Sequence, residues 1–386
     1  MSGRARLRHI IIAEFLFLIG FAMMVPLLPL YARDLGANAT FVGILLAANQ
    51  AVDFFFAPIA GRLSDRYGRR ILLLPAMLLT AVAYFLIGLS GSFAVTLLIW
   101  TVAGIGSSHV LLSQAYVADV TSERRRTSGM GYWGASFALA FVIGPPVGAM
   151  LYARMPDLSA TIAAAVALAA TVYAFIFVRE PERVHHRETE RKSAVLHMSE
   201  LRRSVLTVIA LNFAVIFIWS QFTTILPLYT TDIFKWEVSK YGMYLGSVGL
   251  IAAIVQGGLV GRLVKRFGHG PLVSTGFGAL GVGLAILAAP VNMVTLALSA
   301  FGIATGFGLL MPSLPALLSM NVLPERKGLA LGVFQSASTL ARVIAPLIAG
   351  IIYEEAFPSA PFVLTATLGL LVMVMTSVFT LRDPKN

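Results

Sequence analysis

The chain has 386 residues, of which 58% are hydrophobic and only 12% are charged, and its mean hydropathy is +0.84. A soluble protein cannot keep so much apolar surface away from water, so this composition excludes soluble enzymes and soluble binding modules. A net charge of +11 would suit a nucleic-acid partner, but no polar stretch is long enough to fold into a domain with a basic face. The absence of cysteine excludes disulfides and thiolate metal sites.

Twelve apolar segments follow one another, each about as long as a helix needs to cross a bilayer. The first runs to Tyr31 and is too long for the apolar region of a signal peptide, so we expect it to span the membrane. The sequence therefore predicts an all-α polytopic membrane protein with 12 transmembrane helices. These are expected at residues 9–31, 40–60, 71–90, 94–118, 128–152, 159–178, 205–230, 240–260, 271–290, 293–318, 328–353 and 361–381.

Lys and Arg fall almost entirely in alternate loops. With the N-terminus inside, 24 of them lie on the cytoplasmic side, and only Arg33, Arg154, Lys235 and Lys240 lie outside. Because positive charge is retained on the cytoplasmic side, we expect both termini in the cytoplasm and the protein in the plasma (inner) membrane. The basic residues then orient the chain in the lipid bilayer, and no nucleic-acid partner is expected.

Three patterns recur at an interval of about 200 residues, which indicates duplication. They are residues 61–68 and 261–268, residues 28–31 and 226–229, and residues 144–149 and 345–350. We therefore predict two homologous six-helix bundles, residues 1–178 and 205–386, with the substrate site between the repeats near the bilayer midplane. A polar cytoplasmic linker, residues 179–204, joins them. Its neighbouring His185 and His186 are expected to be solvated rather than metal-bound, because adjacent residues point apart on a helix.

The basic turn after the second segment matches the signature loop of the major facilitator superfamily at Gly61, Asp65, Gly68, Arg69 and Arg70. Further motifs match the twelve-helix drug/proton antiporters of that superfamily. They are Gly20, Pro26 and Pro29 in the first segment, residues 115–119 in the fourth, and Gly131, Gly144, Pro145 and Gly148 in the fifth, where Ala140 and Ala149 replace two glycines. The chain thus resembles this superfamily over essentially its whole length, and its tetracycline and quinolone exporters in particular.

The resemblance implies that Asp65, Arg69 and Asp119 form a conformational latch on the cytoplasmic side of the outward-open state. The alternative is a charged loop that only fixes topology. In the second copy of the turn, Lys265 replaces the acid, so the same latch cannot form there. One departure concerns coupling: the exporters usually carry an arginine four residues before a glycine in helix 4, and Trp100 precedes Gly104 here.

Four ionisable residues fall inside the predicted spans, where each is costly unless it is paired, hydrated or functional. Glu14, Asp53, His109 and Arg342 lie in spans 1, 2, 4 and 11. Because a shielded carboxyl group takes up a proton more readily, we expect Glu14 and Asp53 to carry protons or bind cations, with His109 as a further proton carrier. The alternatives are interfacial exposure of Glu14, a structural pairing of Asp53, and an ordinary hydrogen bond of His109. In the resembled fold helices 2 and 11 are neighbours, which makes Asp53 the expected partner of Arg342.

The spans predicted for the second half contain no acidic residue. Its candidates for a substrate cavity are therefore polar and aromatic side chains. These are Asn212, Trp219, Gln221, Phe222, Tyr244, Gln256, Phe334 and Gln335. A cavity of this kind suits lipophilic or cationic ligands, although any single aromatic residue can instead face lipid or fill the core. The sequence contains no catalytic constellation and no phosphate-binding loop, so no enzyme activity, cofactor or metal is expected.

The sequence therefore predicts a monomeric secondary transporter that works by alternating access, with proton-coupled export of small lipophilic or cationic compounds as the preferred function. Its partners would be a small-molecule substrate, protons or another coupling ion, and the bilayer. One alternative is a uniporter or symporter for a metabolite such as a sugar. The other is a non-transporting membrane receptor or lipid-binding scaffold, for which the Gly/Pro motifs and intramembrane charges would be unnecessary.

Overall fold

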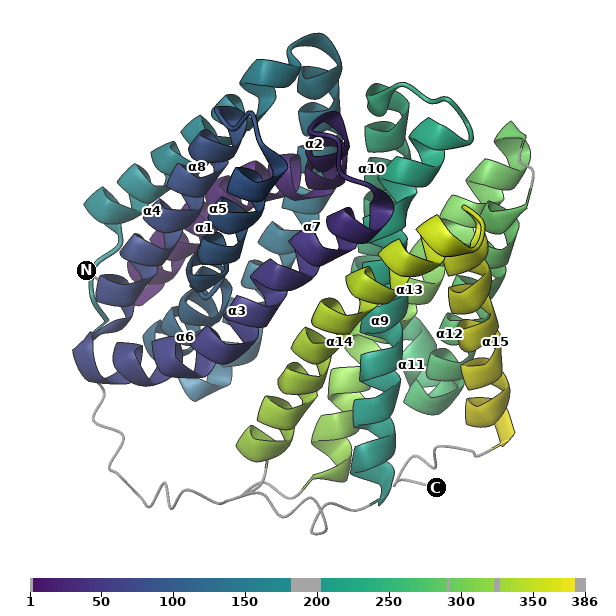
Figure 1. Cartoon of the computed structure of the whole chain (residues 1–386). Coiled ribbons are helices and arrows are strands. Elements are labelled where there is room, and N and C mark those ends of the chain that lie inside the picture. Colours follow the sequence, from purple (N-terminus) through teal and green to yellow (C-terminus); the bar gives the residue numbers. More distant parts are fainter. Residues whose placement is uncertain (1–2, 182–202, 290–291, 323–326, 379–386) are drawn as a thin grey trace. The chain divides into compact units, whose positions relative to one another are not determined.

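The computed structural model describes residues 3–181, 203–289, 292–322 and 327–378 (Figure 1). In this part of the chain there is no strand, and 12 helical segments are long and apolar enough to cross a membrane. A spanning segment must satisfy every backbone hydrogen bond internally, which long apolar helices do. The prediction of 12 helical spans is confirmed, whereas His185 and His186 of the predicted linker lie outside the described residues.

The described chain divides into two compact units, and the first combines Met1–Val25 with Ala51–Leu201. Within it α1 packs against α6, α7 and α8, and α4 packs against α5, α6 and α8. Figure 1 shows α4 beside α8 in this unit. Its helices are α1 (Gly3–Met24), the later part of α3 (Ala39–Tyr67), α4 (Arg69–Gly88), α5 (Phe93–Gly106), α6 (His109–Val120), α7 (Glu123–Arg154) and α8 (Pro156–Phe177).

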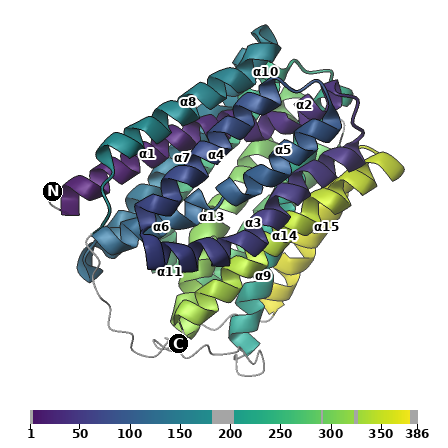
Figure 2. The same ribbon diagram turned by 60° about the vertical axis from the view of Figure 1, so that its left-hand side comes forward.

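The second unit combines Pro26–Gln50 with Arg202–Asn386. In it α9 packs against α13, α14 and α15, while α12 packs against α13 and α15. Figure 2 shows α14 beside α15 in this unit. Its helices are α2 (Leu28–Asp34), the first part of α3, α9 (Arg203–Asp232), α10 (Val238–Ile254), α11 (Val260–Phe267), α12 (His269–Ala288), α13 (Met293–Asn321), α14 (Lys327–Glu355) and α15 (Ala360–Val378). Acids therefore do occur at span ends of the second half, which corrects the expectation that it has none: α9 extends to Asp232 and α14 to Glu355.

Three of the spans are interrupted. A 3-10 turn, Val25–Leu27, separates α1 from α2, and a π-helical turn, Val255–Leu259, separates α10 from α11. The fourth span breaks at Ser107 and Ser108, between α5 and α6. Irregular backbone inside a membrane span occurs where it is buried in protein or lines a cavity, so these breaks mark positions at which a span departs from a simple lipid-facing helix.

The segment Pro26–Gln50 belongs to the second unit because it makes close backbone contacts there. A side chain added at Gly43 would meet the backbone of Pro346, and one at Gly350 would meet the carbonyl oxygen of Ala39. The first part of α3 therefore crosses α14 with backbone against backbone, as small residues permit in membrane helices. The compact units thus differ in this segment from the two predicted six-helix bundles, whose boundaries stay a prediction.

Candidate functional site

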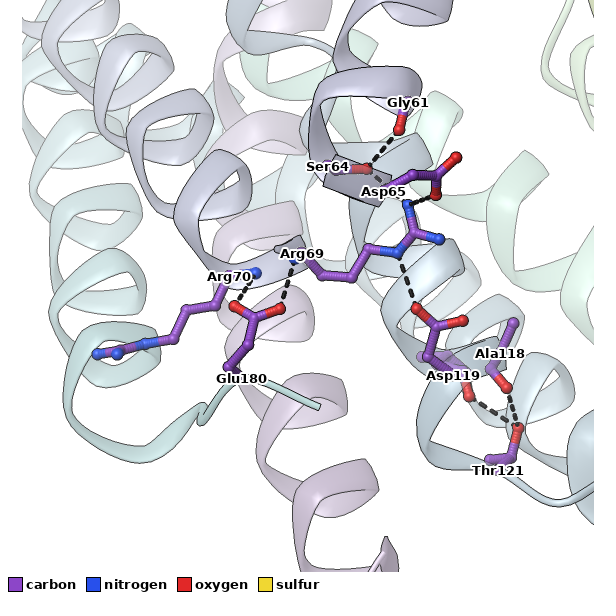
Figure 3. A network of polar contacts seen from close by, with 10 residues as sticks. Gly61, Ser64, Asp65, Arg69, Arg70, Ala118, Asp119, Thr121 and Glu180 are labelled. Atoms are coloured by element: carbon purple, nitrogen blue, oxygen red, sulfur yellow. Dashed lines mark hydrogen bonds and ion pairs between the residues drawn. The ribbon is translucent and has the colours of Figure 1, made fainter. Parts of the chain in front are cut away.

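The guanidinium group of Arg69, the first residue of α4, joins two carboxylates, those of Asp65 in α3 and Asp119 in α6 (Figure 3). Nη1 of Arg69 lies 2.6 Å from Oδ1 of Asp65, and its Nε donates to Oδ2 of Asp119 over 2.8 Å. A third bond runs from Nη1 to the hydroxyl of Ser64, also at 2.6 Å. The structure thus places Asp65, Arg69 and Asp119 in one group, which we call the Arg69 cluster, and all its members lie in the first unit.

Glu180, which follows α8, binds the backbone at the start of α4 (Figure 3). Its carboxylate accepts the backbone N–H groups of Arg69 and Arg70, at 2.6 and 2.9 Å. These are the first residues of α4, whose N–H groups have no partner within the helix. The carboxylate therefore caps α4 and places negative charge at the positive end of its dipole. The Arg70 side chain donates in turn to the carbonyl oxygen of Phe175 over 2.6 Å.

Gly68 makes this cap possible for two reasons. Its φ of 121° and ψ of 150° lie in a region that essentially only glycine adopts. A Cβ at this position would also lie 2.8 Å from the carboxyl carbon of Glu180. The repeated turn has the same feature, because Gly268 has a φ of 77°. Gly61, by contrast, has only an ordinary contact, with Leu111 at 3.8 Å.

Glu14 and His109 form a fully buried pair inside the first unit. Nδ1 of His109 lies 3.1 Å from Oε1 of Glu14, and both side chains are 0% exposed. The imidazole is enclosed by aromatic rings, with the centroids of Phe17 and Phe21 at 4.5 and 6.4 Å. Glu14 is therefore not at an interface, which removes that alternative, and the hydrogen bond of His109 is to an ionisable group.

Two polar atoms of this pair, Oε2 of Glu14 and Nε2 of His109, have no hydrogen-bond partner among the described residues. His109 is also the first residue of α6, directly after the break at Ser107 and Ser108. Oε2 of Glu14 and Nε2 of His109 are therefore available to a further hydrogen-bond partner.

The other two intramembrane candidates belong to different compact units. Asp53 lies in the part of α3 that belongs to the first unit, and Arg342 lies in α14 of the second. Both are partly buried. Their pairing stays a prediction.

The motif glycines of the fifth span have unequal surroundings. A Cβ at Gly144 would lie 2.5 Å from that of Ala22, and one at Gly148 would lie 2.5 Å from the carbonyl oxygen of Met23. These two glycines, with Pro145 between them inside α7, let α7 touch the backbone of α1. A Cβ at Gly131 would meet nothing within 4 Å, so no close approach accounts for glycine there.

The cavity candidates of the second half serve different purposes in the structure. Asn212 donates to the carbonyl oxygen of Phe334 over 3.1 Å and to Ser338, so its amide ties α9 to α14. Tyr244 shares a 2.7 Å hydrogen bond with Ser299. These contacts account for the amide nitrogen of Asn212 and the hydroxyl of Tyr244 without a ligand.

Around Trp219 the surroundings are aromatic. Its ring stacks on Phe307 with centroids 3.9 Å apart and lies 5.5 Å from Phe222. Gln221 is 1% exposed, and its amide has no partner among the described residues. Gln256 lies in the π-helical turn, and Gln335 is exposed on α14. Of this set, Trp219 offers an aromatic surface and Gln221 an amide without a hydrogen-bond partner among the described residues, as expected of substrate contacts.

The family model described as Major Facilitator Superfamily matches residues 10–288 and again residues 257–386. The chain belongs to this superfamily. It is therefore a multi-pass membrane transporter and not an enzyme, and the resemblance expected from the basic turn and the Gly/Pro motifs is confirmed.

Several family members with assigned names are similar over most of their length. The tetracycline resistance protein of class B from Escherichia coli is 26% identical over 349 residues, which cover 88% of this chain and 86% of the relative. The multidrug resistance protein 1 of Bacillus subtilis (strain 168) is 26% identical over 346 residues, with 88% and 87% covered. The quinolone resistance protein NorA of Staphylococcus aureus is 23% identical over 341 residues and 88% of both chains.

Solved structures of the family share the fold. A crystal structure of the human organic anion transporter MFSD10 (TETRAN) superposes with a TM-score of 0.74 at 24% identity, covering 97% of this chain and 100% of the other. A variant of the nucleoside transporter NupG gives a TM-score of 0.84 at 11% identity, with the same coverage. At such identities the likeness extends to the fold alone.

Sequence reasoning missed Glu180 and the contact between Glu14 and His109. Glu180 stands among several charged residues that follow the sixth span, and nothing in their order distinguishes it. Its signal was indirect: glycine at position 68 leaves space beside the start of a helix whose N–H groups need an acceptor. Glu14 and His109 were each singled out by their cost inside a span, but 95 residues separate them, and only the packing of α1 against α6 shows the contact.

Proposed function

We propose that the protein exports small lipophilic or cationic compounds in exchange for protons, by alternating access. The names of its relatives support the substrate class, since proteins associated with tetracycline, multidrug and quinolone resistance match about nine-tenths of the chain. The distribution of Lys and Arg supports an orientation with both termini in the cytoplasm. In that orientation the Arg69 cluster lies at the cytoplasmic ends of the spans.

The observation that carries proton coupling is the buried pair of Glu14 and His109. Both residues lie in membrane spans, and their two ionisable groups share a 3.1 Å contact. A neutral imidazole beside a carboxylate has a net charge of −1, and one added proton makes the pair neutral. When the pair loses that proton, a negative charge remains buried. Burial makes this charged form costly, so deprotonation favours a state in which water or a cation reaches the pair.

We infer that the Arg69 cluster acts on the conformational equilibrium rather than on overall stability. Asp65 and Asp119 are 40% and 37% exposed, and exposed ion pairs contribute only about 0.2–1 kcal/mol each. A two-state equilibrium responds to differences of this size, because about 1 kcal/mol changes it about fivefold. The cap from Glu180 fixes the start of α4, and so holds the Arg69 backbone from which the guanidinium reaches both acids.

One observation keeps a second function in consideration, a uniporter or symporter for a metabolite. Where the exporters usually carry an arginine in helix 4, Trp100 is buried and packs beside Tyr84, with ring centroids 6.2 Å apart. This position supplies no charge, so proton coupling in the present chain depends on other residues. Glu14 and His109 supply such a group in spans 1 and 4, which is why we favour the coupled exporter.

Flux of a fluorescent lipophilic cation such as ethidium into or out of proteoliposomes distinguishes these functions. Proton-coupled export predicts that an imposed pH gradient drives the dye against its own gradient. A uniporter would equilibrate a substrate at a rate that does not depend on the pH gradient, and a symporter would move it in the direction of the protons. A receptor or scaffold would give no flux above that of protein-free liposomes, and any of these three results would contradict the proposal.

A further inference from the structure

A second group of charges, at the ends of spans 1, 7 and 11, lies wholly within the second unit. Nη2 of Arg33 lies 2.9 and 2.8 Å from the two carboxylate oxygens of Asp232. The hydroxyl of Tyr353 donates to the same carboxylate over 2.9 Å. Arg33 comes from α2, Asp232 from the last residue of α9, and Tyr353 from the last turns of α14. We call these three residues the Asp232 cluster.

Two further bonds hold the same part of the chain. The carboxylate of Glu354 accepts the backbone N–H of Ala39 over 3.1 Å, and so caps the first turn of α3 from α14. The hydroxyl of Tyr241, on α10, donates to the carbonyl oxygen of Pro26 over 3.0 Å. That carbonyl lies in the 3-10 turn that interrupts the first span, where the regular helical hydrogen-bond pattern ends. Each bond ties the segment Pro26–Gln50 to a different helix of the second unit.

Close packing adds to these bonds. Gly350 lies against the backbone of Ala39, and Gly43 lies against that of Pro346. Tyr241 is 1% exposed and Ala39 is 0% exposed, whereas the side chains of Arg33 and Asp232 are 34% and 31% exposed. The far ends of spans 1 and 2 thus meet spans 7, 8 and 11 in a contact with a buried centre, at Ala39 and Tyr241, and a charged rim that water reaches.

In the proposed orientation these ends face away from the cytoplasm. Arg33 precedes the loop between spans 1 and 2, and Asp232 precedes the loop between spans 7 and 8. Alternating access requires a substrate to leave on this side, and the segment Pro26–Gln50 is continuous with the spans of the first half. We propose that Arg33, Asp232, Tyr353 and Glu354 are the outer gate of the transport cycle, and that the contacts described above are its closed form. This inference rests on the proposed transport function and its orientation.

The other interpretation of the Asp232 cluster is a permanent bond that only stabilises the fold. The two differ in what happens when the bond is removed. A permanent bond would lower stability without changing access from outside, because α2 and α3 would stay in place. A gate would open more often, because the open state has already lost these bonds and is not affected by their removal.

The chain has no cysteine, so one introduced thiol is a clean reporter of access. We would place it at Ala39, which is small and fully buried in the contact, and label intact cells with a membrane-impermeant maleimide. Against the Ala39→Cys background, Arg33→Gln and Asp232→Asn should each raise the labelling rate about two- to fivefold, as expected for losing a partly exposed ion pair. Tyr353→Phe should raise it less, since it removes one neutral donor.

Two controls make the result decisive. Lys240→Gln removes another positive charge on the same side from an exposed position of α10, and should leave the labelling rate unchanged. Exchanging the charges, Arg33→Asp with Asp232→Arg, should return the rate toward that of the background. The proposal is wrong if the single variants label at the background rate, or if labelling rises only in step with a lower thermal midpoint and the exchange does not reverse it.

Tyr353→Phe keeps the test decisive if the charge variants fail to reach the membrane, because it leaves the ion pair intact. Labelling at the background rate in this variant would then reject the gate. The labelling is measured without substrate and without a pH gradient. A protein that fails to export dye but shows the labelling pattern would refute the proposed substrate and coupling while keeping the gate. Normal export with unchanged labelling would refute the gate while keeping the proposed substrate and coupling.

Discussion

Replacing Gly68 by alanine should loosen the start of α4 and displace Glu180. The backbone at Gly68 has a φ of 121° and a ψ of 150°, a conformation that costs a residue with a side chain about 1–3 kcal/mol. The added methyl group would also lie 2.8 Å from the carboxyl carbon of Glu180. A contact this short forces the carboxylate to move, and with it the bonds of 2.6 and 2.9 Å to the N–H groups of Arg69 and Arg70.

A hydrogen bond to a charged group contributes about 1.5–3 kcal/mol. Loss of one such bond adds to the backbone strain, so Gly68→Ala should cost about 2.5–6 kcal/mol in all, while Glu180→Gln should cost less because it keeps an acceptor. The two changes act on the same contact, and their effects should not add. With the cap already displaced by Gly68→Ala, the further change Glu180→Ala should have little effect.

Hydrogen exchange of the first turn of α4 and the thermal midpoint of the purified protein measure this. Gly268→Ala is the matched control, since Gly268 has a φ of 77° in the corresponding turn of the second unit. It should lower the midpoint but leave exchange at α4 unchanged. Additive effects of Gly68→Ala and Glu180→Ala, or normal protection of the first turn of α4 in both, would refute the account of the cap.

Three further predictions concern transport and packing. Asp65→Asn should slow transport at near-normal abundance, because an exposed pair adds little stability; unimpaired transport would exclude the latch. Asp53→Asn and Arg342→Gln should each reduce transport, with a double variant less impaired than the sum of both losses, and strictly additive losses would reject their pairing. Gly148→Ala should destabilise the protein by about 1–3 kcal/mol through its contact with α1, whereas Gly131→Ala, which meets nothing within 4 Å, should be neutral in the same thermal assay.

The spans could be predicted because a bilayer imposes one simple requirement on length and polarity. Each of the 12 apolar segments became a helical span, with ends shifted by a few residues. Those small shifts had consequences, since α9 extends far enough to include Asp232 and α14 to include Glu354. Hydropathy does not locate a helix end to within one residue. Asp232 and Glu354 lie at such ends, and each forms a hydrogen bond to another span.

Contacts within the site were predictable only where a motif specified them. The positions of Asp65, Arg69 and Asp119 came from a family pattern, and the structure brings their side chains together. The contact of Glu14 with His109 has no such pattern, because it depends on the rotation of α1 against α6 and on the break that starts α6 at His109. Hydropathy averages over a window and does not detect a break of two residues.

Gradient-driven flux of one variant tests most directly whether protons move through the pair of Glu14 and His109. In proteoliposomes, Glu14→Gln should still exchange a lipophilic cation across the membrane at equal pH, since the fold and the gates are intact. It should no longer concentrate that cation in response to a pH gradient, because an amide cannot take up and release a proton. Gradient-driven accumulation by Glu14→Gln at the rate of the parent protein would contradict the account.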